Sequence, residues 1–142
     1  MNDEETRPRP ATLAAQAQPS ADVERIADRA LSMWHDAASA LSPIIGERGV
    51  AALFRRSLYF QQIEHPGLAT AYAAASQPDA FVVLRATLLQ QTPAAAAAAN
   101  DALLQTFIDL LSSLIGPALT ERLIGFVHPL PSIGTAVQDK QP

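Results

Sequence analysis

Three arginines and a tyrosine form the most distinctive polar cluster in the sequence. The segment GERGVAALFRRSLYF contains Arg48, Arg55, Arg56 and Tyr59. Arg48 and Arg55 are seven residues apart, so on a helix they share one face. Tyr59 lies one turn beyond Arg55, where its ring could stack on the guanidinium. Such a face could bind an acidic protein partner, a phosphate or a nucleic acid. It could equally be a solvated face balanced by nearby acids such as Glu47.

The three histidines are the next candidates for chemistry, and their spacing matches no helical metal pair. His65 and His128 each precede a proline, which places both at expected helix ends. His35 lies on the polar face of a predicted helix, as the phosphoacceptor of a histidine phosphotransfer domain does. Those domains usually place lysine and glycine after the histidine, where this chain has Ala38 and Ser39. A phosphoacceptor and a solvated surface histidine therefore both remain open.

Other catalytic patterns are absent from the sequence. It contains no cysteine, which excludes disulfides, thiolate metal sites and cysteine nucleophiles. It has no GxSxG elbow, no phosphate-binding GxxxxGK[ST] loop and no GxGxxG motif. We therefore expect a protein that is not an enzyme, without a metal or another cofactor.

Four aromatic residues on apolar helix faces suggest a different function: Trp34, Phe54, Phe81 and Phe107. If they enclose an unfilled space in the core, the protein could be a sensor of a small apolar ligand. The alternative is that the four rings fill the core themselves.

The elements that must position these residues are helices. Apolar residues recur at three- and four-residue steps, and no period-two run bounded by hairpin turns occurs. The expected helices cover 20–45, 47–63, 79–91, 94–115 and 117–127, with a short helical turn in 68–76. Ser20 is the expected cap of the first helix. The sequence thus predicts an all-α fold, a compact bundle of about five helices over 20–128, between flexible tails at 1–19 and 129–142.

Two similar hexapeptides suggest internal symmetry. LSPIIG at 41–46 and LSSLIG at 111–116 each close an amphipathic helix that is followed by another helix. Glycine at such a corner tolerates the left-handed conformation that ends a helix. The fold could therefore be two pseudo-symmetric helical hairpins, although the shared residues are common at helix ends and the match could be coincidental.

The distribution of charge points to an interaction protein. The net charge of −4 and the pI of about 5.2 argue against nucleic-acid binding. Only four charged residues occur in 66–120, so these helices either lie at the centre of the bundle or form an interface. No apolar stretch reaches the roughly 18 residues of a membrane span. Our leading hypothesis is a cytoplasmic adaptor or regulatory subunit that self-associates through 66–120.

Overall fold

The computed structural model describes residues 8–77 and 79–126. Its elements follow one another as α1 (Pro8–Gln61), the short 3-10 helix η1 (Pro66–Leu68), α2 (Ala69–Ala73), α3 (Ala80–Leu89), α4 (Pro93–Ile115) and α5 (Pro117–Ile124). No strand occurs in this part of the chain. The prediction of an all-α bundle is confirmed.

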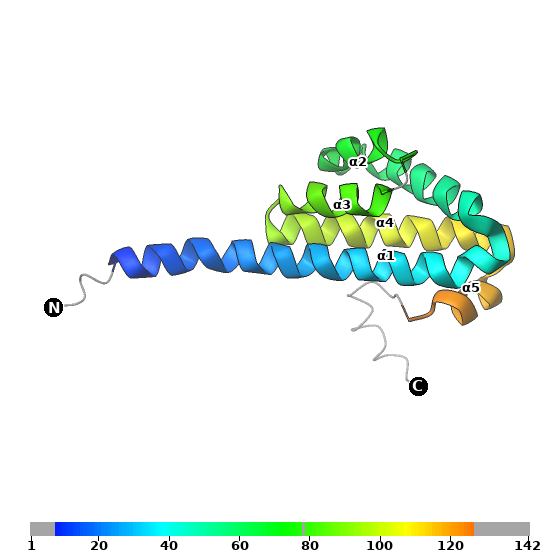
Figure 1. Cartoon of the computed structure of the whole chain (residues 1–142), viewed down its shortest axis with the longest axis horizontal. Helices are drawn as coiled ribbons and strands as arrows, with labels where there is room; N and C mark the ends of the chain where they lie inside the picture. The colour runs from blue at the N-terminus through cyan, green and yellow to red at the C-terminus, as the bar shows by residue number, and fades with distance from the viewer. Residues whose placement is uncertain (1–7, 78, 127–142) are drawn as a thin grey trace.

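Helix α1 consists of two arms that meet at Gly46. This glycine interrupts the helix with φ 81° and ψ 159°. The first arm (8–45) and the second arm (47–61) therefore run in different directions, and α4 packs against α1 (Figure 1). The second arm ends at Gln61, two residues before the expected end. The Gln61 side-chain amide donates a hydrogen bond of 2.7 Å to the Thr106 hydroxyl of α4.

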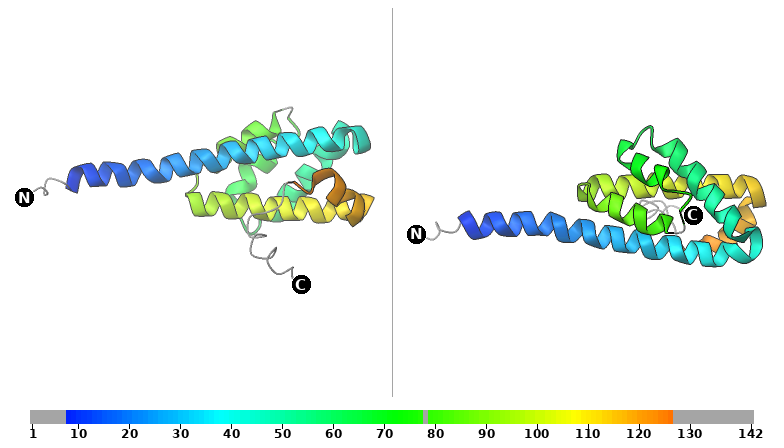
Figure 2. Two further views of the ribbon diagram at one scale, coloured as in Figure 1. Left: turned by 90° about the horizontal axis from the view of Figure 1, so that it is seen from below. Right: turned by 45° about the horizontal axis from the view of Figure 1, so that its top comes forward.

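The first arm begins at Pro8 and not at Ser20, the expected cap. Residues 8–19 continue the helix towards the N-terminus, so α1 begins earlier than we expected, and the flexible N-terminal tail stays a prediction. Pro8 and Pro10 lie in the first turn, whose N–H groups need no partner within the helix, whereas Pro19 lies inside the helix, where proline is usually disruptive. The alanines that follow are strong helix formers. This end of α1 extends beyond the other helices (Figures 1 and 2).

The remaining predictions for the two ends of the chain fall outside the described residues. They concern 1–7, the predicted tail at 129–142 and the last residue expected of the fifth helix, Val127. The described part of that helix ends at Ile124.

The core forms where α4 packs against α1. One face of α4 is fully buried: Ala96, Ala99, Asn100, Leu103, Leu104, Phe107 and Leu111. Trp34 of the first arm is 1% exposed, and its indole N–H donates a 2.9 Å hydrogen bond to the Asn100 side-chain oxygen. Burial alone does not account for the scarcity of charge in 66–120, since among the exposed described residues of this segment only Asp79 and Asp109 carry a charge. Most large apolar side chains that are exposed lie outside 66–120: Ile44, Tyr59, Phe60, Ile63 and Phe126, against Val82 and Leu114 inside it.

The two hexapeptides form equivalent corners. Gly46 and Gly116 are the glycines with positive φ among the described residues, and their ψ values, 159° and 149°, are also close. This is not the left-handed helical conformation that we expected but a more extended one, open almost only to glycine. It lets one helix follow another after a single residue. When the two glycines are aligned, 41–45 and 47–54 match 111–115 and 117–124 in degree of burial at every position. The glycine corners are thus confirmed, and the duplication remains a prediction.

None of the described helices is long and apolar enough to cross a membrane.

Partial burial of Asp101 in α4 changes the pKa of its carboxyl group, and this change can be tested. Loss of hydration raises the pKa of its carboxyl above the ordinary value of 3.8. The ionised form therefore destabilises the folded state, and this effect is complete once the pH exceeds the folded-state pKa. We expect Asp101→Asn to increase the free energy of unfolding at pH 7. The gain should shrink as the pH falls through the folded-state pKa and vanish below 3.8, where the carboxyl is protonated in both states.

Urea unfolding at several pH values measures this effect. Asp109→Asn is the matched control, because Asp109 is an exposed aspartate of the same helix and accepts a hydrogen bond from Gln105. The control should show no comparable gain. An Asp101→Asn protein that is no more stable than the unmutated protein at pH 7 would contradict the prediction.

Candidate functional site

Arginine and aromatic side chains form a continuous series on the second arm of α1 and on α2. The Arg55 guanidinium lies over the Tyr72 ring at 5.0 Å, and the Tyr72 and Tyr59 ring centroids are 5.8 Å apart. Tyr59 lies 5.6 Å from Phe60, whose ring the Arg56 guanidinium covers at 5.2 Å. We call this series, Arg55–Tyr72–Tyr59–Phe60–Arg56, the arginine–aromatic ladder. Helical spacing brings Arg56 onto Phe60, whereas the packing of α2 brings Tyr72 to the second arm.

The ladder is largely exposed, and its two arginines have no carboxylate partner among the described residues. Tyr59 and Phe60 are 49% and 40% exposed, and Ile63 just beyond them is 73% exposed. Both arginines are exposed. Neither forms an ion pair with any described residue. The surface therefore combines flat apolar rings with two cations that have no carboxylate partner in the described part of the chain.

The structure brings together three of the four residues that the sequence analysis assigned to partner binding. Arg55, Arg56 and Tyr59 belong to the ladder, but Arg48 has no contact with it among those described. The ring that stacks on Arg55 is that of Tyr72, whereas we expected Tyr59. Tyr72 and Phe60 were not among the residues expected to bind a partner. The spacing of Arg56 and Phe60, one helical turn, could have identified Phe60.

The four aromatic residues proposed to line a ligand pocket contact one another. Ring centroids of Trp34 lie 5.0 Å from Phe54, 6.0 Å from Phe81 and 5.1 Å from Phe107. Phe54 and Phe81 are 4.8 Å apart. Trp34, Phe54 and Phe107 are almost fully buried. The four rings thus pack on one another in the core, and the apolar-ligand pocket that we assigned to them stays a prediction.

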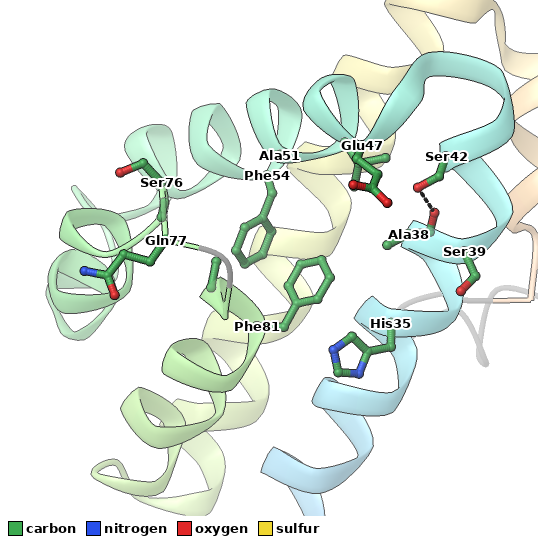
Figure 3. Close-up of a pocket in the computed structure, with 13 residues that line it drawn as sticks. His35, Ala38, Ser39, Ser42, Glu47, Ala51, Phe54, Ser76, Gln77 and Phe81 are labelled. Atoms are coloured by element: carbon green, nitrogen blue, oxygen red, sulfur yellow. Dashed lines mark hydrogen bonds between the residues drawn. The ribbon is translucent and has the colours of Figure 1, made fainter.

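A half-open cavity of about 570 Å³ lies beside this cluster, between the two arms of α1 and the beginning of α3. Phe54 and Phe81 line it, but Trp34 and Phe107 do not. Its other lining residues are His35, Ala38, Ser39, Ser42, Glu47, Val50, Ala51, Ala75, Ser76, Gln77 and Ala80. In Figure 3, His35 and Glu47 lie on the same side of the two phenylalanine rings, and Ser76 and Gln77 lie on the other side.

His35 is exposed and lies at the edge of this cavity, with its ring 5.3 Å from that of Phe81. The sequence predicted its exposure correctly, since the polar face of the first arm points away from the core. Its assignment as a phosphoacceptor stays a prediction. No group of three histidine, aspartate or glutamate residues among 8–77 and 79–126 could hold a metal ion.

Comparisons with protein-family models, with curated proteins and with solved structures found no match to this chain.

Proposed function

We propose that this protein is a non-enzymatic interaction module, a cytoplasmic adaptor or regulatory subunit, that binds an acidic segment of a partner protein through the arginine–aromatic ladder. The single observation behind the proposal is the continuous series of contacts from Arg55 to Arg56. Protein interfaces are enriched in tyrosine, phenylalanine and arginine at their centres.

The geometry of the ladder limits the entropic cost of binding. Each arginine already lies on an aromatic ring, so a partner would have to immobilise less of a flexible side chain. Stacking also leaves the edges of a guanidinium free to donate hydrogen bonds to a carboxylate. The exposed rings of Tyr59 and Phe60 offer apolar area beside those cations. An acidic segment that also carries apolar side chains would satisfy both features.

Self-association through 66–120 remains the competing prediction. The exposed face of α4 carries mainly small or polar side chains, such as Ala95, Ala98 and Gln105. Few exposed residues of this segment carry a charge, and small side chains offer a partner little contact area. The ladder therefore provides a stronger reason for a partner than the composition of 66–120 does.

Site-specific photo-crosslinking in cells can test this proposal. A benzophenone amino acid in place of Ile63, at the end of the ladder, should crosslink to an identifiable protein. The same group in place of Gln105 on α4 should not. The double change Arg55→Ala/Arg56→Ala should abolish the crosslink from position 63. With the purified partner, this double change should weaken binding about tenfold or more, since two stacked arginines at an interface centre are typical hot spots.

Arg122→Ala is the matched control, because Arg122 is an exposed arginine of α5 outside the ladder. It should leave the affinity for the purified partner unchanged. The proposal is wrong if position 63 yields no crosslinked protein. It is also wrong if Arg122→Ala weakens binding as much as the double change does. Crosslinks from position 105 to a second copy of the chain would instead support self-association through 66–120.

A further inference from the structure

The half-open cavity beside Phe54 and Phe81 has the size and lining of a small-molecule site. Its volume of about 570 Å³ falls within the range of roughly 300–1,000 Å³ that is typical of ligand pockets. Seven of its thirteen lining residues are phenylalanine, valine or alanine, and the other six are polar. An apolar chain or ring of a ligand could therefore pack on the two phenylalanines.

The polar groups of the cavity indicate the head group of such a ligand. Glu47 is the one formally charged residue of the lining. It has no ion pair with any residue in the described part of the chain. The side chains of His35 and Ser39 likewise form no hydrogen bond with a described residue. Figure 3 shows Glu47 and His35 next to the phenylalanine rings, whereas Ser76 and Gln77 direct their polar groups away from them.

We propose that this cavity binds a small amphipathic amine, with its ammonium group at Glu47 and its apolar body on Phe54 and Phe81. Aromatic rings near the ammonium add an attraction that is specific to cations. The second arm of α1 begins after Gly46, and the partial positive charge at its first turn repels an ammonium group. The full negative charge of Glu47 within that turn outweighs it. This site is distinct from the ladder, so the two proposals can fail separately.

Three matched probes distinguish the possible head groups: 2-phenylethylamine, 2-phenylethanol and phenylacetate. Isothermal titration calorimetry should show millimolar affinity for the amine, as is usual for so small a molecule. The amine should bind about fivefold more tightly than the alcohol, the upper range for a solvent-accessible ion pair. Phenylacetate should bind more weakly than both. Amide chemical shifts in NMR spectra should change at Ser39, Glu47 and Phe81.

Two pairs of variants locate the site. Glu47→Gln should remove the preference for the amine over the alcohol. Glu24→Gln is the control, because Glu24 is an exposed glutamate on the other arm of α1, and this variant should retain the preference. Ala51→Phe should fill the cavity and abolish binding of both probes. Ala52→Phe should not, since Ala52 is an equally exposed neighbour outside the lining.

Several results would overturn the proposal. One is that no probe shows saturable binding. Another is that phenylacetate binds as tightly as the amine. A third is that the Ala51→Phe protein binds the probes as well as the unmutated protein does. The last would place the bound amine elsewhere on the molecule.

Discussion

Replacing Trp34 by alanine should destabilise the protein by about 3–5 kcal/mol, a large part of the roughly 5–15 kcal/mol that stabilises a typical domain. Two physical effects add up here. The change removes a ring that contacts Phe54, Phe81 and Phe107, and it leaves a cavity where α1 meets α4. It also removes the donor to Asn100, whose buried oxygen then loses its hydrogen bond. Urea unfolding, followed by far-UV circular dichroism, measures the loss.

Further variants separate the two effects. Trp34→Phe keeps an aromatic ring but removes the N–H donor, so it should lose less stability than Trp34→Ala. Adding Asn100→Leu to Trp34→Phe should recover part of that loss, because an unsatisfied buried oxygen is then absent. His35→Ala, at the next position but on the exposed face, should cost less than about 1 kcal/mol. Water-like fluorescence of Trp34 in the native protein, together with a mild effect of Trp34→Ala, would contradict the observed packing.

Replacing Gly46 by alanine should cost about 1–3 kcal/mol, for a reason that involves no side-chain contact. A Cβ atom added at Gly46 meets nothing within 4 Å, so there is ample space for it. The cost comes from the backbone, since φ 81° with ψ 159° is a conformation that L-residues rarely adopt and glycine adopts readily. Gly116→Ala should behave similarly, because its Cβ would also meet open space at φ 93°. Thermal unfolding of both variants tests this expectation.

A D-alanine at position 46, introduced by chemical ligation, is the matched control. A D-residue has the mirror-image preferences and accepts positive φ far more readily than an L-residue, so this protein should be more stable than the one with L-alanine. If L-alanine and D-alanine had the same effect, the positive φ of Gly46 would not be the cause. In that case the two arms of α1 would meet by some other geometry.

The sequence by itself determined which segments are helical, where the corners lie and which faces are buried. These features depend on local chemistry, namely helical periodicity, proline and glycine positions and the fit of apolar residues to one face. Trp34 is buried and His35 is exposed for this reason, and Gly46 and Gly116 form corners because few other residues can. The start of α1 was missed because Pro8, Pro10 and Pro19 predicted a tail, whereas α1 begins at Pro8 and continues through all three.

Only the tertiary structure decided which side chains from distant segments meet. The contact between Arg55 and Tyr72 depends on how α2 folds back onto the second arm, and no local pattern encodes that path. Asn100 accepts the hydrogen bond of Trp34 although 66 positions separate them. The cavity between His35, Glu47 and Phe81 likewise exists because the chain turns at Gly46 and α3 packs into the angle between the arms. Periodicity specifies the face of each helix, but the packing of whole helices determines which faces meet and what space they leave.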